Sequence, residues 1–383
     1  MYYIILLFHG KIPSKILDGE VAGQRPVFKN MDKKFKTCLL LLTGGIDKID
    51  GNTLKMADSI DKVHSREESV TMKVIVTGGA GFIGSHIVDL LIERGDQVVI
   101  IDNLSSGKKE HIHPEAKWIE VDLTNPELRD VFMREKPEAV IHQAAQIRVD
   151  VSVEDPVFDA NTNIIGTINL LEACRKSGVK KVVYASSAAV YGDPKYLPVD
   201  EEHPVSPLSG YGISKHTVEH YLEVYAHLYG LKYTILRYAN VYGLRQDPRG
   251  EGGVISILVD KYLKKEPFTI FGDGEQTRDY IYVEDVAKAN VAALSKGDGE
   301  ILNVGTGVQT SLNQLLTLFD EIASFENQKV HGPDRPGDIK HSYFNNDKVC
   351  RILDWKPKYT LMEGLRKTYE YYQNEYRKMD KEM

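Results

Sequence analysis

Short apolar runs alternate with longer amphipathic segments from Met72 to about Arg237. Six runs are rich in β-branched residues and have the length of buried strands. They occupy residues 74–77, 98–101, 118–121, 139–142, 181–185 and 233–237. Strands that alternate with helices form a parallel sheet, because each crossover returns the chain to the same end of the sheet. The pattern predicts an α/β fold, a Rossmann-like doubly wound parallel sheet.

The alternation ends after Asn240, where glycine, proline and charged residues become more frequent. We therefore expect two regions, a dinucleotide-binding domain over residues 72–240 and a smaller substrate-binding lobe over most of residues 241–383. A last helix is predicted from Met362 to about Met379, with its charged residues facing solvent.

Residues 1–71 show no sustained period of 2 or 3.6. The simplest hypothesis is an appendage, disordered or a mis-annotated start, with Met72 as the natural first residue. The alternative is a small regulatory or docking segment.

Two predicted helices carry broad apolar surfaces. The first spans residues 164–173 and the second begins near Tyr211. The apolar face of the second is formed by Val218, Tyr221, Leu222, Tyr225 and Leu228. Such helices are covered on more than one side, which predicts a homodimer joined through them. Burial within one chain is the alternative.

Composition narrows the classes of partner. The chain has 383 residues, 42% hydrophobic content and a formal net charge of -7, which predicts a globular protein that binds neither nucleic acid nor an anionic membrane. Its three cysteines are far apart in sequence, so we expect no disulfide framework and no metal site. No apolar run approaches the length of a membrane span. The predicted compartment is the cytoplasm.

Three glycines follow the first predicted strand. Gly78, Gly81 and Gly84 have the spacing G-x-x-G-x-x-G. Glycines at such positions turn the chain, let the backbone approach a pyrophosphate and pack the helix against the strand. The helix start also offers free N–H groups to phosphates. The motif predicts a dinucleotide site, and a plain turn is the alternative.

Acidic residues end the next two strands. Asp102 lies roughly 20 residues beyond the glycines, where a carboxylate can hold the adenosine ribose or, alternatively, cap a turn. Such a carboxylate would repel a 2′-phosphate, which favours NAD over NADP, although Lys108 and Lys109 lie nearby. Asp122 could accept from the adenine amino group or cap the turn into the next helix.

Tyr211 and Lys215 are four positions apart on a predicted helix, so their side chains should share one face. A phenol with a pKa of about 10 is a weak base at neutral pH, but a neighbouring cation and the positive nicotinamide favour the phenolate. Tyr211 could then take a hydroxyl proton from a substrate.

Two serines, Ser186 and Ser187, end the fifth predicted strand. Ligands of open α/β sheets bind at the carboxyl ends of strands, so one of these hydroxyls can bridge the reacting oxygen and Tyr211. The alternative is that one of the two hydroxyls merely caps the turn.

Five ordered motifs resemble those of the extended short-chain dehydrogenase/reductases. The motifs are Thr77–Gly84, Ser186–Gly192, Tyr211-x-x-x-Lys215, Arg237–Asn240 and Arg278–Val283. Within that group the chain is similar to the NAD-dependent epimerases and dehydratases of nucleotide sugars, UDP-glucose 4-epimerase above all. The resemblance covers Met72 to the C-terminus.

The resemblance implies Tyr211 as catalytic base, Lys215 as the residue that holds the nicotinamide ribose and tunes Tyr211, and Ser187 as their hydrogen-bonding partner. It implies NAD contacts at Gly78, Gly81, Phe82, Ile83, Gly84, Asp102, Asn103, Asp122, Leu123, Asn163, Tyr211 and Lys215. It implies substrate contacts at Ser187, Asn240, Arg278 and Arg335. The two arginines would clamp a diphosphate, and a surface ion pair is the alternative for each.

Departures from the family pattern argue against two other reactions of the family. Members that dehydrate the sugar resemble Thr-Asp-Glu where this chain has Ser187, Ala188 and Ala189, and decarboxylating members carry a glutamate at the position of Ala189. Without an acid there, both reactions are disfavoured. Gly210 replaces a common proline, which would loosen the start of the catalytic helix without removing a functional group.

The resemblance implies NAD-dependent epimerisation at C4 of a UDP-hexose, UDP-glucose or UDP-galactose, through a 4-keto sugar. The gate beside the sugar falls at Ser342 or Tyr343, and a small Ser342 leaves a UDP-N-acetylglucosamine or UDP-glucuronate 4-epimerase as the alternative. A net-redox dehydrogenase and a non-catalytic NAD-sensing scaffold are the other classes. The intact Ser187, Tyr211 and Lys215 argue against the scaffold.

Overall fold

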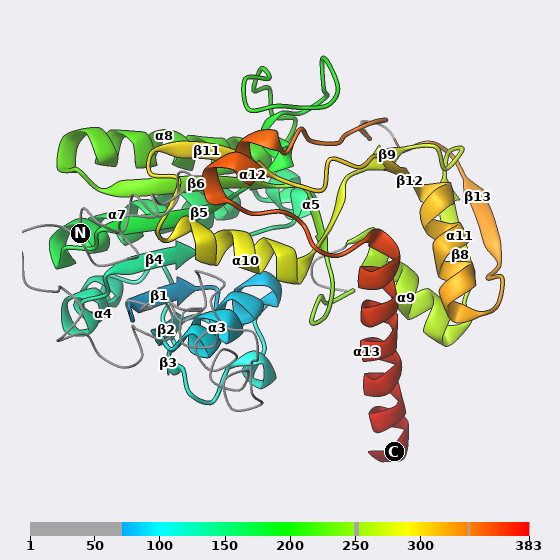
Figure 1. Cartoon of the computed structure of the whole chain (residues 1–383), viewed down its shortest axis with the longest axis horizontal. Helices are drawn as coiled ribbons and strands as arrows, with labels where there is room; N and C mark the ends of the chain where they lie inside the picture. The colour runs from blue at the N-terminus through cyan, green and yellow to red at the C-terminus, as the bar shows by residue number, and fades with distance from the viewer. Residues whose placement is uncertain (1–70, 249–252, 336–337, 383) are drawn as a thin grey trace, which may run out of the picture. The chain divides into compact units, whose positions relative to one another are not determined.

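A seven-stranded parallel sheet organises the part of the chain that the computed structural model describes, namely residues 71–248, 253–335 and 338–382 (Figure 1). The strand order is β11-β6-β5-β4-β1-β2-β3. The strands are β1 (Lys73–Thr77), β2 (Gln97–Ile101), β3 (Lys117–Ile119), β4 (Ala139–His142), β5 (Lys181–Ser187), β6 (Lys232–Tyr238) and β11 (Glu300–Val304). The predicted Rossmann-like fold is confirmed, and all six predicted strands are present. The predicted appendage lies outside the described residues, except for Thr71.

Alternate residues of each strand face opposite layers of helices. Val74 and Val76 of β1 point to one core and Ile75 to the other. The first core is covered by α3 (Phe82–Arg94), α10 (Val283–Ala293) and α12 (Asp347–Leu353). The second is covered by α4 (Glu127–Glu135), α7 (Gly166–Ser177) and α8 (Gly210–Tyr229). Because both faces are buried, the strands read as continuous apolar runs in the sequence.

The strand order reverses beside β1. β1 pairs with β2 on one side and with β4 on the other, so the connections that leave the carboxyl ends of β1 and β4 diverge. In open α/β sheets the ligand binds in the crevice at such a point.

The chain beyond residue 240 contributes to two regions. β11 pairs with the outer edge of β6, and α10 and α12 pack on the sheet. The remainder forms a smaller lobe with its own core, in which Tyr262, Leu315 and Phe319 are fully buried. The exact division at residue 240 stays a prediction. The lobe contains β7 (Asn240–Tyr242), α9 (Val254–Lys264), β8 (Phe268–Phe271), β9 (Thr277–Arg278), β10 (Tyr280–Tyr282), β12 (Thr310–Ser311), α11 (Leu312–Ala323), β13 (Lys329–Gly332) and α13 (Leu361–Glu382).

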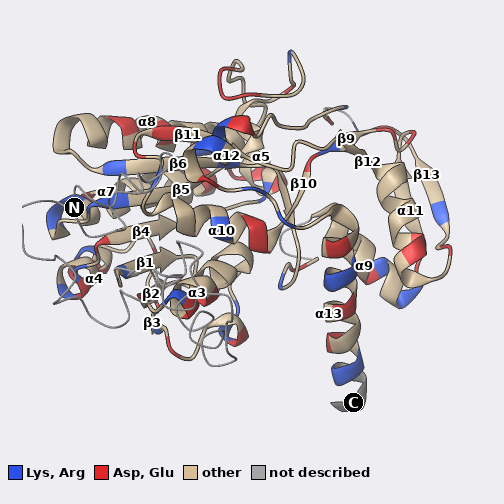
Figure 2. Ribbon diagram, in the orientation of Figure 1, with Lys and Arg blue, Asp and Glu red and all other residues tan. Residues whose placement is uncertain are grey.

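The last helix, α13, begins one residue before its predicted start. Acidic and basic residues alternate along it, as Figure 2 shows, and Leu365 and Tyr369 are buried in the core of the lobe. No helix among the described residues is both long and apolar enough to cross a membrane.

The apolar face predicted to join two subunits is mostly used inside the chain. Val218, Leu222 and Tyr225 of α8 are buried in the core of the sheet, so assigning them to a dimer contact was wrong, and burial within one chain is correct for them. Leu228 of the predicted face is exposed, and so are other apolar side chains on α8, on α5 (Val149–Glu154), on α6 (Pro156–Ala160) and on the π-helical turn η4 (Asn161–Ile165). The exposed apolar residues of these four elements are Val149, Val153, Val157, Phe158, Ile165, Ile213, Val224 and Leu228.

Candidate active site

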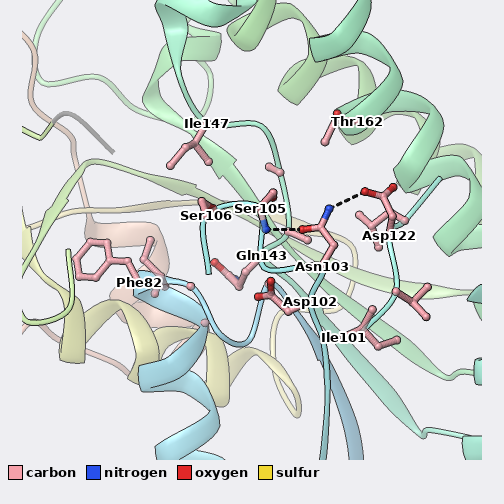
Figure 3. Close-up of a pocket in the computed structure, with 18 residues that line it drawn as sticks. Phe82, Ile101, Asp102, Asn103, Ser105, Ser106, Asp122, Gln143, Ile147 and Thr162 are labelled. Atoms are coloured by element: carbon pink, nitrogen blue, oxygen red, sulfur yellow. Dashed lines mark hydrogen bonds between the residues drawn. The ribbon is translucent and has the colours of Figure 1, made fainter. Parts of the chain in front are cut away.

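A pocket opens at the carboxyl ends of β1, β2 and β4 (Figure 3). Nine of the predicted cofactor residues line it: Gly78, Gly81, Phe82, Ile83, Gly84, Asp102, Asn103, Asp122 and Leu123. The other three, Asn163, Tyr211 and Lys215, are not among the residues that line it. The pocket therefore lies where the reversal of strand order predicts a ligand.

Glycine is required at two positions of the loop after β1. Gly78 has a φ of +68°, and a Cβ there would lie 2.7 Å from the backbone nitrogen of Ala144. A Cβ on Gly84 would lie 2.0 Å from the carbonyl oxygen of Gly78. Neither position can accept a side chain without moving backbone. The tight loop leaves the helix start of α3 open to a phosphate, as a dinucleotide requires.

Asp102 is buried at the end of β2. Its carboxylate accepts hydrogen bonds from the backbone nitrogens of Ala80 at 2.9 Å and Leu104 at 2.8 Å. Burial raises the pKa of Asp102, and these two hydrogen bonds act against the rise. The carboxylate thus fastens the glycine loop and also lines the pocket, so both roles weighed from the sequence are compatible with its geometry.

The two lysines near Asp102 that could have attracted the 2′-phosphate of NADP contact other groups. Lys108 pairs with Asp247 at 3.1 Å, and Lys109 lies 5.5 Å from the centre of the Trp118 ring. With an acid at Asp102 and these cations held by other groups, the pocket fits NAD.

Asp122 and Asn103 contact each other in the lining of the pocket. Asn103 Nδ2 donates to Asp122 Oδ2 at 2.6 Å, as drawn in Figure 3. Asp122 Oδ1 accepts from the backbone nitrogen of Thr124 at 2.8 Å. Asp122 therefore caps the turn and lines the pocket at once.

The sequence reasoning missed several lining residues. They are Ile101, Ser105, Ser106, Val121, Gln143, Ala144, Ala145, Ile147 and Thr162. The segment that follows β4 could have been found, because it leaves the carboxyl end of a predicted central strand.

Tyr211 and Ser187 meet at the end of β5. Ser209 caps α8 by accepting from Gly212 N at 3.1 Å, which places Tyr211 in the first turn. Ser187 acts on its phenol and lowers the pKa of Tyr211. Ser187 also accepts from Ala189 N at 3.2 Å, so one serine both caps the turn and contacts the tyrosine.

Ser186 points elsewhere. Its hydroxyl donates to Glu219 at 2.6 Å, so the structure brings Ser187, and not Ser186, to Tyr211.

Lys215 lies on the same face of α8 as Tyr211, as predicted. Its Nζ is 5.9 Å from the centre of the Tyr211 ring and donates to the carbonyl oxygen of Ala185 at 2.8 Å. Burial lowers the pKa of Lys215 to about 8, while the charges of Asp159 and Glu219 act in the opposite direction.

The protein alone does not favour the phenolate of Tyr211. Burial raises its pKa to about 12, the hydrogen bond with Ser187 opposes the rise, and the charge of Asp159 adds to it. In the protein alone desolvation dominates and the Lys215 ammonium bonds a carbonyl oxygen. Lowering of the Tyr211 pKa by Lys215 together with the nicotinamide stays a prediction.

The structure explains why position 210 is a glycine. A Cβ on Gly210 would lie 2.7 Å from the carbonyl oxygen of Ser152. The close approach of these two segments, rather than looseness alone, accounts for glycine before Tyr211.

Asn163 lies in the π-helical turn η4, with its side chain buried and fully engaged. Its Oδ1 accepts from Gln146 N at 2.8 Å, and its Nδ2 lies 3.0 Å from Ser214 Oγ. It supports the catalytic helix, and a direct cofactor contact stays a prediction.

The predicted diphosphate clamp lies in the smaller lobe. Arg278 in β9 pairs with Asp338 at 2.6 Å, and the Arg335 guanidinium stacks 4.0 Å from the centre of the Phe271 ring. Asn240 begins β7 with an exposed side chain. The ion pair considered for Arg278 is present, and binding of phosphate by these three residues stays a prediction. The described residues contain no cluster of three or more metal-binding side chains.

A Rossmann sheet with a dinucleotide pocket, together with a serine, a tyrosine and a lysine at the end of β5 and the start of α8, is typical of an enzyme that uses a nicotinamide cofactor. A model of the NAD-dependent epimerase/dehydratase family matches residues 74–305. The chain belongs to the NAD-dependent epimerase/dehydratase family.

Individual relatives agree with this family. UDP-glucose 4-epimerase of Mycolicibacterium smegmatis is 43% identical over 310 residues, which cover 79% of this chain and 99% of the relative. The crystal structure of UDP-glucose 4-epimerase from Thermotoga maritima with UDP-glucose is 48% identical, with a TM-score of 0.78, and the match covers 80% of this chain and 100% of that one. The UDP-N-acetylglucosamine 4-epimerase from Methanobrevibacter ruminantium M1, in complex with UDP-N-acetylmuramic acid, is 37% identical with a TM-score of 0.76, over 80% of this chain and 99% of that one.

Proposed function

We propose that the chain is a UDP-glucose 4-epimerase, which interconverts UDP-glucose and UDP-galactose using NAD. The observation that carries the proposal is that Lys215 Nζ lies 5.9 Å from the centre of the Tyr211 ring on one face of α8, with Ser187 at the end of β5 acting on the same phenol. The family and the relatives named above support the same reaction.

The residues divide the chemistry as follows. Tyr211 accepts the proton of the C4 hydroxyl and later returns it. Ser187 holds the reacting oxygen and the phenol in one hydrogen-bonded line. Lys215, fixed by the carbonyl oxygen of Ala185, keeps a positive charge beside them. Bound NAD would be held by the loop Gly78–Gly84 and by Asp102, and it supplies a hydride acceptor and donor at C4.

Anchoring of the nucleotide is assigned to the smaller lobe. Arg278, Arg335 and Asn240 would hold the diphosphate and leave the sugar free to turn between its two faces. A guanidinium suits such contacts because its planar donors match phosphate oxygens. Binding of phosphate by Arg278 would compete with its pairing to Asp338.

The test is to incubate the purified full-length chain with UDP-galactose and NAD, resolve the products by chromatography and follow NADH absorbance. Formation of UDP-glucose without accumulation of NADH is expected. Steady NADH production would replace the epimerase with a dehydrogenase. Lack of conversion of any UDP-hexose, with the cofactor bound, would favour the non-catalytic scaffold.

A second candidate is a UDP-N-acetylglucosamine 4-epimerase, which the small Ser342 favours. Ser342 is half-buried, and its backbone nitrogen donates to the carbonyl oxygen of Thr277 at 3.2 Å. If this segment borders the sugar, Ser342→Tyr should abolish turnover of the N-acetylated sugar and spare UDP-glucose. Equal loss for both sugars would place the gate elsewhere.

We also propose a cytoplasmic homodimer. The exposed apolar side chains of α5, α6, η4 and α8 support the dimer, since burying them in a contact between two subunits removes apolar surface from water. Phe158→Asp and Val224→Asp should give a monomer in sedimentation, whereas an unchanged sedimentation coefficient would exclude this surface as the interface.

A further inference from the structure

Asp159 is a buried acid that the proposed chemistry does not use. It lies on α6, and only 1% of the residue is exposed. Its Oδ1 accepts from Gln146 Nε2 at 2.7 Å and from Asn163 Nδ2 at 3.1 Å. No lysine, arginine or histidine among the described residues forms an ion pair with it. A buried carboxylate without such a partner is costly and needs an explanation.

The hydrogen bonds of Asp159 lead to the catalytic helix. Asn163 Nδ2 lies 3.0 Å from the hydroxyl of Ser214, and that hydroxyl donates to the carbonyl oxygen of Tyr211 at 3.0 Å. Asn163, Gln146 and Ser214 are all buried. The acid therefore sits at the base of a polar network that reaches the first turn of α8.

The network depends on an irregular helix. Residues Asn161–Ile165 form a π-helical turn between α6 and α7. Such turns are rare and are frequently found at functional sites. Here the turn carries Asn163, which links Asp159 to Ser214.

Asp159 also acts on the catalytic pair through its charge. The charge of Asp159 acts to raise the pKa values of both Tyr211 and Lys215, and so favours their protonated forms. Glu219 acts on Lys215 as well, but Arg237 balances its charge. Other titratable groups face the pair from β4, β5 and β6. They are His142, Tyr184 and Tyr238. Burial, and then the charge of Lys215, lowers the pKa of His142 to about 3.

We propose that Asp159 is a positioning residue for the proposed epimerase reaction: its carboxylate fixes the first turn of α8 through Gln146, Asn163 and Ser214, and supplies the negative charge that balances Lys215. This inference rests on the assignment of Tyr211 and Lys215 as catalytic. It also implies that Asp159 stabilises the oxidised cofactor over the reduced one, since only the oxidised nicotinamide ring is positive.

The test is Asp159→Asn, which keeps an acceptor oxygen and removes the charge. Both ionisations of the pair should move to lower pH, so the pH profile of turnover should shift downward by about one unit. The fraction of bound cofactor that is reduced in the presence of saturating UDP-glucose, read from NADH absorbance, should rise.

Two variants separate charge from position. Gln146→Met removes hydrogen bonds and keeps the charge, so it should lower turnover with the profile at its original pH. Glu154→Gln removes an exposed charge near α6 and should change neither readout.

The charge role would be overturned if the pH profile of Asp159→Asn, scaled to the same maximum turnover, superimposed on that of the wild type. It would also be overturned if Gln146→Met shifted the profile as far as Asp159→Asn does. If Asp159→Asn does not fold, Asp159→Ser provides a second neutral acceptor. If neither folds, the residue is structural and the proposal is wrong. An inactive wild type would refute the proposed function instead, which keeps the two failures distinguishable.

Discussion

Glu219 and Arg237 form a buried bidentate ion pair, with Arg237 Nε 2.9 Å from one carboxylate oxygen and Nη2 2.6 Å from the other. The same carboxylate accepts from Ser186, the neighbour of Ser187, at 2.6 Å. The pair thus connects the catalytic helix, α8, to strands β5 and β6.

Removing one partner of this pair should destabilise the protein strongly. Glu219→Gln leaves the buried Arg237 without its counter-charge, and we expect a loss of about 3–5 kcal/mol in the free energy of unfolding. Urea denaturation at neutral pH measures it. The double variant Glu219→Gln with Arg237→Met should recover part of the loss. A single variant as stable as the wild type would show that the pair contributes little.

Tyr211→Phe and Arg278→Ala should affect different kinetic parameters. Loss of the phenol should lower kcat by about 10²–10⁴-fold with a small change in KM, since a proton acceptor is lost. Loss of the guanidinium should chiefly raise KM. Steady-state kinetics with UDP-galactose checks both. Similar losses in both parameters for both variants would contradict the assigned roles.

Gly84→Ala should abolish NAD binding. The added Cβ would lie 2.0 Å from the carbonyl oxygen of Gly78, so the loop that receives the pyrophosphate must open. Calorimetric titration with NAD measures the loss. Gly178→Asn is the control: a Cβ on Gly178 would have no atom within 4 Å, and its φ of +80° is one that asparagine tolerates. Equal NAD affinity in Gly84→Ala and the wild type would place the cofactor elsewhere.

His86 should make the protein sensitive to acid. Burial lowers its pKa from 6.5 to about 4, so the unfolded chain binds a proton that the folded protein does not. Stability is therefore lost as the pH falls from about 6.5 to about 4, by about 2 kcal/mol at about pH 5.

His86→Gln should remove this part of the acid sensitivity. Urea denaturation at about pH 7 and about pH 5 compares the variant with the wild type. His227→Gln, at an exposed position of α8, should leave the difference between the two pH values unchanged. A His86→Gln variant that loses as much stability on acidification as the wild type would show that His86 is not responsible.

Much of the nucleotide-binding fold could be predicted because its strands are buried on both faces. Val74–Val76 and Val98–Ile101 are continuous apolar runs, and periodicity locates them directly. β11 was not predicted, because Asn303 interrupts its apolar run. In the structure Asn303 accepts from the Tyr191 hydroxyl at 2.7 Å and donates to the carbonyl oxygen of Val199 at 3.1 Å. Such distant partners leave no local signal.

The site also combines features with a local sequence signal and features that depend on residues distant in sequence. The glycine loop and the Tyr211–Lys215 spacing are local, so the sequence reveals them. Asp159 looks like an ordinary solvent-facing acid on a helix until Gln146 and Asn163 fold around it. The upward shift of the Tyr211 pKa also depends on burial, which spacing along the chain cannot show.

The position of β11 has a consequence for synthesis. A nascent chain that has only reached the end of β6 presents that strand as an open edge, with unpaired backbone donors and acceptors. The edge closes only when Glu300–Val304 has left the ribosome and paired with β6. The sheet that binds the cofactor is thus completed late in translation, after part of the substrate lobe has been made.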